Sequence, residues 1–197
     1  LVSDERYNVT DSSLDQVSPG AEYARFVLVD GSIAANRGAL EQDQSIGGVC
    51  VKRGGEFLML GGRVVNNVGD LAGGVGFPGE VAQRGMTPCR VDLRGGIIAG
   101  NTGNVSGAVG SLAIGNEYEL FCIGGTVAIT NNAAVQGFGG VFSCLGLTLG
   151  GAPIIKDNKS VTANGQGLIA ITAEVDTSAM PVESATEPLA EGAEIWV

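Results

Sequence analysis

The chain has 197 residues, a formal net charge of −10 at pH 7, 33 glycines and no histidine. Without histidine it lacks the usual general base near neutral pH and the commonest metal ligand, which excludes Ser-His-Asp and Cys-His nucleophiles and Cys/His zinc sites. A sequence pI near 4.3 argues against nucleic acid or an anionic membrane as a partner.

Charge divides the chain into three segments. Residues 1–24 hold five acids and one base, residues 25–172 hold ten of each, and residues 173–197 hold six acids and no base. We therefore expect an acidic N-terminal cap at 1–24, a repeat body at 25–172 and an acidic C-terminal segment at 173–197 that ends in an apolar strand. The body contains an uncharged run from Leu120 to Ile155, but its eight glycines and its amides do not suit a membrane-spanning helix.

A repeat runs through the body. Each copy has a short apolar strand, a glycine pair or its equivalent, an apolar residue and then an asparagine. The second glycine of each copy falls at 31, 62, 96, 125 and 151, with spacings of 31, 34, 29 and 26 residues. The asparagines are Asn36, Asn67, Asn101, Asn131 and Asn158. A second signature, Gly-Gly-Val or a variant of it, begins at Gly47, Gly73, Gly107 and Gly139, with a weaker copy at 165–168.

Short runs with period 2 between glycines predict strands, because helical repeats need longer segments with a period of 3.6. Stacking such repeats produces a parallel β-solenoid. We expect an all-β fold, a single-stranded right-handed parallel β-helix of about five rungs with non-repeat terminal segments. Three inward columns would fill its interior: Phe26/Phe57/Val91/Leu120, Leu28/Met59/Leu93/Cys122 and Ile33/Val64/Ile98/Val127/Ile154.

The alternation of Gly-Gly-Val with apolar-x-x-Asn resembles the right-handed β-helix repeats of bacterial cell-surface proteins, autotransporter passenger domains and chlamydial polymorphic outer-membrane proteins. The resemblance covers roughly residues 25–172, and Ile33-Ala34-Ala35-Asn36 stands where those repeats carry Phe-x-x-Asn. It implies a secreted or surface-displayed scaffold used in adhesion or assembly, usually without catalysis.

Charged residues also recur in register. Six residues before the marker glycine stand Arg25, Glu56, Arg90 and Glu119, which predicts a ladder of alternating charge along the stack. Nearby, Arg90, Asp92 and Arg94 form the best cluster for carboxylate catalysis. Because no other acid shares the offset of Asp92, we interpret this cluster as a surface ion pair.

Apolar residues at outward positions predict an interface. On the strands that carry the glycine pair these are Val27, Val29, Leu58, Leu60, Phe121 and Ile123, which either a terminal segment of the chain or a partner subunit would cover. The two extremities are also apolar: Leu1, Val2, Ile195, Trp196 and Val197. They would cap the chain's own ends or add as strands to a neighbouring subunit.

The four cysteines are Cys50, Cys89, Cys122 and Cys144. We expect mostly unpaired thiols that pack as small apolar residues, with Cys122 pointing inward and Cys50 outward. One intrachain bridge, an intermolecular bond or a metal remain alternatives. No Cys-x-x-Cys pair is present, so we expect neither a metal nor a cofactor.

These observations predict a non-catalytic extracellular or cell-surface module, either an adhesin domain or a subunit of a self-assembling filament. The expected partner is a second copy or a surface ligand of a host or neighbour, glycan or protein, without nucleic acid and without membrane insertion. The alternatives are a polysaccharide lyase or hydrolase and a glycan-binding β-helix similar to a phage tail spike.

Overall fold

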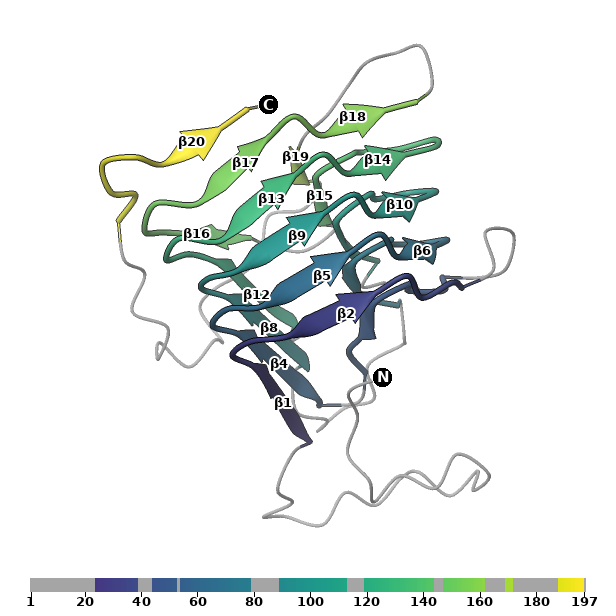
Figure 1. Ribbon diagram of the computed structural model, residues 1–197, viewed down its shortest axis with the longest axis horizontal. Helices are drawn as coiled ribbons and strands as arrows, with labels where there is room; N and C mark the ends of the chain where they lie inside the picture. The colour runs from purple at the N-terminus through teal and green to yellow at the C-terminus, as the bar shows by residue number, and fades with distance from the viewer. Residues whose placement is uncertain are drawn as a thin grey trace.

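The structure is a computed structural model that describes residues 24–38, 44–52, 54–78, 89–112, 119–143, 147–161, 169–171 and 188–196. Within these ranges the chain forms strands, turns and bends without a helix, so no described helix could span a membrane. All strand pairs among them are parallel, and the strands stack turn upon turn (Figure 1). The predicted all-β parallel solenoid is confirmed.

Four sheets run along the stack. Sheet 1 has the order β1-β4-β8-β12-β16, formed by Arg25–Leu28, Glu56–Met59, Cys89–Leu93, Glu119–Ile123 and Thr148–Leu149. Sheet 2 has the order β2-β5-β9-β13-β17-β20, formed by Ser32–Ala34, Arg63–Val65, Ile97–Ala99, Ala128–Thr130, Ile154–Lys156 and Glu194–Ile195.

The other two sheets complete each turn. Sheet 3 has the order β6-β10-β14-β18, formed by Val68–Gly69, Thr102–Gly103, Ala133–Ala134 and Lys159–Ser160. Sheet 4 has the order β3-β7-β11-β15-β19, formed by Val49–Cys50, Val75–Phe77, Val109–Ser111, Val141–Ser143 and Ile169–Ile171.

The turns at the two ends differ from those between them. Three turns, at 56–77, 89–111 and 119–143, have a neighbouring turn on both sides. In the first turn, at 25–50, Arg37 makes only an isolated bridge to sheet 3. The sequence predicted about five rungs, a count that includes this turn and the last one, at 148–171. The structure has about three turns that are enclosed by neighbours on both sides.

The predicted register is correct for the first three turns and wrong from the fourth onward. The corner between β8 and β9 holds three residues, 94–96, but the corner between β12 and β13 holds four, 124–127. As a result Phe121 pairs with Val91 and Ile123 with Leu93. By backbone register, the predicted Leu120 and Cys122 fall opposite Arg90 and Asp92 instead.

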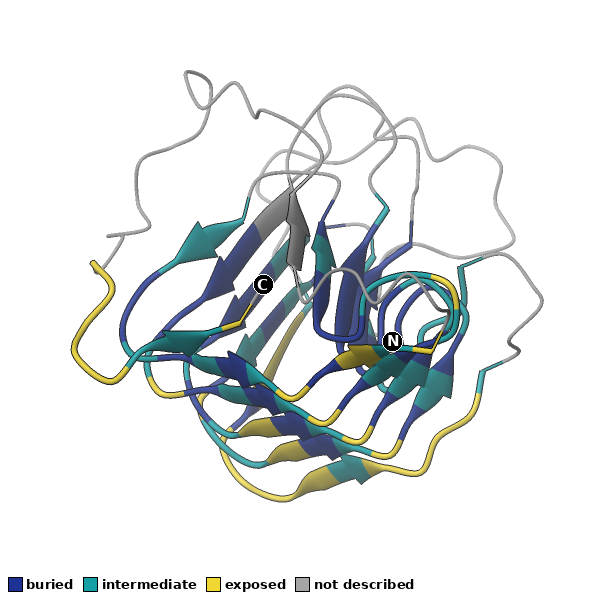
Figure 2. Cartoon of the chain, turned by 90° about the horizontal axis from the view of Figure 1, so that it is seen from above, coloured by how far each residue is buried: buried dark blue, intermediate teal, exposed yellow. Residues whose placement is uncertain are grey.

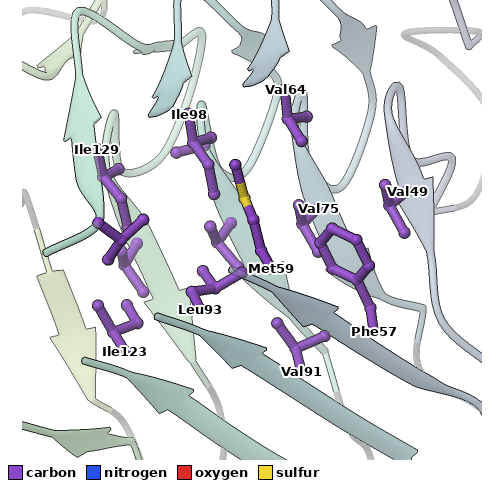
Figure 3. Packing of buried hydrophobic residues seen from close by; sticks show 14 of the residues in the cluster. Val49, Phe57, Met59, Val64, Val75, Val91, Leu93, Ile98, Ile123 and Ile129 are labelled. Atoms are coloured by element: carbon purple, nitrogen blue, oxygen red, sulfur yellow. The ribbon is translucent and has the colours of Figure 1, made fainter. Parts of the chain in front are cut away.

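The corrected columns form the hydrophobic core, except in the first turn, where Phe26 is 38% exposed. They are Phe26/Phe57/Val91/Phe121, Leu28/Met59/Leu93/Ile123 and Ile33/Val64/Ile98/Ile129/Ile155. Ile129 and Ile155 therefore take the places predicted for Val127 and Ile154; Val127 is buried at the corner, and Ile154 is half-buried on the outer side. Figure 3 shows Met59, Leu93 and Ile123 side by side in the interior.

The second signature forms the opposite wall of this core. Val49, Val75, Val109 and Val141 are Cα partners on successive turns and are all buried, as the Gly-Gly-Val repeat predicts. The weaker copy at 165–168 lies outside the described residues. In the last turn, the Cα partner of Val141 is Ile169. Seen from above, the buried segments line the inside of the turns and the exposed ones lie outside (Figure 2).

An asparagine ladder follows sheet 2 and is buried in all turns but the first. Its members are Asn36, Asn67, Asn101, Asn132 and Asn158. The Oδ1 atom of each later member accepts hydrogen bonds of 2.9–3.0 Å from the backbone N–H and the Nδ2 of the asparagine one turn earlier. Asn132 replaces the predicted Asn131, because the longer corner shifts the register by one residue.

The residue before each ladder asparagine has a left-handed backbone. Ala35, Asn66, Gly100, Asn131 and Asp157 have φ between 55° and 64°. Glycine and asparagine adopt this conformation at low cost, whereas alanine does so at a penalty. The turn therefore positions every ladder side chain through the residue that precedes it.

Candidate functional site

Five charged side chains gather on the outer face of sheet 1. These residues, called here the ion cluster, are Arg25, Glu56, Arg90, Asp92 and Arg94. Arg25 is on β1, Glu56 on β4, Arg90 and Asp92 on β8, and Arg94 on the corner that follows β8. Side chains alternate between the two faces of a strand, so these residues point outward while their neighbours point into the core. Adjacent strands thus bring together residues that are 31 to 34 positions apart in the chain.

Two acids link the three guanidinium groups. Arg25 Nε donates to Glu56 Oε2 at 2.6 Å, and Arg90 Nε lies 3.7 Å from Glu56 Oε1. Arg90 Nη2 donates to Asp92 Oδ2 at 3.1 Å, and Arg94 Nη2 donates to the same oxygen at 3.2 Å. The hydrogen bond to Glu56 raises the pKa of Arg25 above its usual value.

Asp92 is the enclosed member of the cluster. Its side chain is 7% exposed, and Arg94 Nε donates to its second oxygen, Oδ1. Both carboxylate oxygens therefore accept hydrogen bonds from arginine. This geometry favours the predicted surface ion pair over a catalytic carboxylate.

The predicted charge ladder extends over three turns only. Arg25, Glu56 and Arg90 are Cα partners in sequence along sheet 1. The fourth predicted member, Glu119, is the partner of Cys89, and Leu120 is the partner of Arg90. The inclusion of Glu119 was wrong because the corner after β12 is one residue longer than the corner after β8.

The predicted apolar interface is smaller than expected. Val29 is 64% exposed and Leu60 is 50% exposed, and Val27 and Leu58 also lie on the outer side of sheet 1. Phe121 and Ile123, however, are 2% and 1% exposed because they point into the core. Of the six residues predicted for this interface, the four that lie at outward positions are on β1, β4 and the corners that follow them.

Cys122 occupies the outward position between Phe121 and Ile123, as the Cα partner of Asp92. Its free thiol is nevertheless buried. Burial, followed by the negative charge of Asp92, raises the pKa of the thiol, while Arg90, Arg94 and a hydrogen bond with Thr148 partly oppose this increase. The inward orientation predicted for Cys122 was wrong, but its behaviour as a small buried residue was correct.

Two other cysteines have described positions. Cys50 is half-buried between the buried Val49 and Val51, and Cys89 packs against the core. Cys144 lies outside the described residues. Among the part of the chain that the structure describes, no group of three or more Cys, Asp or Glu side chains could hold a metal ion.

A second surface is the outer side of sheet 2, called here the flat face. Its six strands lie side by side in Figure 1. Since the Ile98 column points inward, the flanking residues point outward in two columns: Ser32, Arg63, Ile97, Ala128, Ile154 and Glu194, and Ala34, Val65, Ala99, Thr130 and Lys156. The middle of this face is uncharged, and Ile97 is 39% exposed.

Sequence reasoning did not find the flat face. A signal was present, because three residues of the inward column, Ile33, Ile98 and Ile129, are flanked on both sides by a small or aliphatic residue. The error in register concealed this signal in the fourth and fifth turns.

The C-terminal strand β20 closes sheet 2. Ile195 is the Cα partner of Ile155 in the same chain, so this segment caps the chain's own last turn. Lys156 Nζ donates to Glu194 Oε2 at 2.7 Å, which raises the pKa of Lys156, and the same atom lies 5.9 Å from the centre of the Trp196 ring. The other predicted extremities, Leu1, Val2 and Val197, lie outside the described residues.

Together these sheets define the chain as a repeat protein of the parallel β-solenoid class. No known protein family matches it, and neither curated proteins nor solved structures contain a significant match.

Proposed function

We propose that the chain is a non-catalytic structural and adhesive module that attaches to a second copy of itself through the flat face. The single observation that carries this proposal is the uncharged, half-exposed middle of that face, which extends over neighbouring turns. A contiguous apolar surface of this kind is typical of a protein contact. The expected extracellular or cell-surface location depends only on the resemblance of the repeats to bacterial surface β-helices.

The distribution of charge favours a second copy as the partner. Arg63 lies in the second turn, and Glu194 lies four strands further along the same column. A two-fold axis through Ala128, parallel to its strand, would place Arg63 of one copy opposite Glu194 of the other. The same axis would place Ile97 opposite Ile154, which is the self-complementary arrangement that two-fold interfaces require.

The chemistry of the face argues against a glycan as the principal ligand. Recognition of sugars requires convergent polar groups, but the two outward columns contain only two hydroxyl side chains, Ser32 and Thr130. Trp196, the exposed aromatic at the edge, already contacts Lys156. The polysaccharide-degrading alternative receives no support from Asp92, whose oxygens are occupied by Arg90 and Arg94.

Sedimentation and bead clustering test the proposal. The full chain is expected to form dimers, and beads coated with it are expected to cluster, whereas Ile97→Glu reduces both by placing a charge on the flat face. Val161→Glu is the matched control, because Val161 is an exposed aliphatic residue that follows sheet 3. Equal dimerisation of Ile97→Glu and the control would refute the proposal, as would a monomeric chain that binds a glycan array.

A further inference from the structure

The segment that carries β20 has the geometry of an additional, partial turn. Gly192 has φ 91°, nearly the same as φ 92° at Gly31, the corner glycine that precedes β2. Ile195 extends the inward column that begins with Ile33 and ends with Ile155. Ile195 therefore takes the position in the last described turn that Ile33 takes in the first, and a glycine with left-handed backbone stands one residue before β2 and two residues before β20.

The backbone contacts of the two strands also match. The N–H groups of Glu194 and Trp196 donate to the carbonyls of Pro153 and Ile155, each at 2.9 Å. At the opposite end of sheet 2, parallel pairing uses alternate residues of β2, so the N–H groups of Ser32 and Ala34 face away from β5. These two groups correspond to those of Glu194 and Trp196.

The ends of the asparagine ladder are complementary as well. At the first turn, no described residue donates to Oδ1 of Asn36, whereas each later Oδ1 accepts two hydrogen bonds. At the last turn, no described residue accepts from the backbone N–H of Asn158, whereas the equivalent N–H groups of earlier turns donate to the next asparagine. One end thus presents an acceptor and the other a donor.

We infer that the two ends of the solenoid form an interface for head-to-tail stacking of copies, and that β20 is a plug that occupies this interface. When β20 is detached, β2 of a second copy takes its place on β17. Ser32 and Ala34 then donate to Pro153 and Ile155, Ile33 replaces Ile195 in the core, and Asn36 accepts from Asn158. This contact goes beyond the proposed function, since it uses the backbone edges at the ends of the stack and not the outward side chains of the flat face.

A release variant of the full chain tests this inference. Glu194→Pro with Trp196→Pro removes both strand donors of β20, and the matched control Glu194→Gln with Trp196→Phe keeps them. Both are prepared with Ile97→Glu, so that the flat face does not contribute to the result. We expect the release variant to form open-ended assemblies larger than dimers, seen by sedimentation and negative-stain imaging, and the control to remain monomeric.

A second substitution identifies the surface that binds. Ala34→Pro removes one of the two N–H groups of β2 that face away from β5, and in the release variant it is expected to restore the monomer. The control Ala34→Ser keeps this N–H and is expected to leave the assemblies intact. The inference fails if hydrogen exchange shows β20 detached and the remaining turns protected while the chain stays monomeric, or if assemblies form regardless of Ala34→Pro.

Discussion

The asparagine ladder and the ion cluster are both columns of polar side chains that cross the turns, yet they differ in extent. The ladder has a member in every turn from Asn36 to Asn158, and its amides bond to one another and to backbone carbonyls. The ion cluster connects only three neighbouring strands and ends at Arg94. The ladder continues past the turn with the longer corner, whereas the ion cluster ends in the turn before it.

The difference shows which kind of contact tolerates a change in corner length. A ladder asparagine follows β9 or β13 at the same distance, since Asn101 comes two residues after Ala99 and Asn132 two residues after Thr130. The longer corner lies before β13 and leaves this spacing unchanged. The ion cluster is on sheet 1, whose strands come before the corner of each turn. In the fourth turn, the residues opposite Arg90 and Asp92 are Leu120 and Cys122, which carry no charge to continue the cluster.

The largest test of the comparison is the removal of one ladder amide. Asn101→Leu deprives Asn67 of its acceptor and Val64 and Asn132 of donors. Buried polar groups without partners each cost about 1–3 kcal/mol, so we expect the free energy of unfolding to fall by about 3–5 kcal/mol. Asn36→Leu, at the exposed end, is the control and should cost less than about 1 kcal/mol in urea titrations. Equal losses would mean that the ladder is not a buried network.

Substitution of the enclosed acid measures the ion cluster. Asp92→Asn removes the carboxylate that Arg90 and Arg94 share, while Arg90 keeps Glu56, and we expect a loss of about 1–3 kcal/mol by urea unfolding. Arg25→Gln removes the most exposed member and should change stability by about 0–1 kcal/mol. A loss for Asp92→Asn as large as that for Asn101→Leu would remove the distinction between the two columns. The same variant tests the enzyme alternative, which predicts loss of activity on acidic glycans.

A smaller effect concerns the left-handed residue before the first ladder member. Ala35 has φ 58°, and in later turns glycine, asparagine or aspartate stands at the equivalent position. Ala35→Asn should therefore raise stability by about 0.5–1 kcal/mol in thermal unfolding. Ala34→Asn, at a neighbouring extended position, is the control and should bring no gain. A decrease for Ala35→Asn would mean that the conformation of this turn differs from that of the later ones.

The smallest effect is the pH dependence caused by Cys122. Burial raises the pKa of its thiol in the folded chain, so the unfolded chain loses this proton first as the pH rises. The stabilising contribution is complete below the pKa of the unfolded thiol and is lost as the pH increases through the folded pKa. Unfolding followed between neutral and alkaline pH should show a decline that is shallower in Cys122→Ala, and Asp92→Asn should lower the pKa of this thiol.

Much of the fold could be predicted from the sequence because most of the information is periodic. Strands recur between glycines, and equal corners in the first three turns fix the partners of Phe57 and Val64 correctly. The residue-level prediction failed where a corner gained one residue, since the glycine pair 124–125 aligns equally well in either register. Only the packing of Phe121 and Ile123 in the core decides between the two.

The site was less predictable than the fold. Charges at Arg90, Asp92 and Arg94 are visible in the sequence, but their pairing depends on side-chain geometry that the sequence does not contain. The terminal segment is another example. Its apolar residues predicted a strand. Whether this strand pairs with its own chain or with a neighbouring copy depends on the edge of β17, where Ile195 pairs with Ile155.

The asparagine ladder also has a consequence for the chemical ageing of the protein. Asparagine deamidates when the backbone nitrogen of the following residue attacks its side-chain carbonyl. In the ladder, the N–H groups of Val68, Thr102, Ala133 and Lys159 donate to carbonyls of the preceding turn at 2.9 Å. The amides that hold the stack together are therefore also those whose neighbouring nucleophile is immobilised, so the ladder should resist deamidation for as long as the chain stays folded.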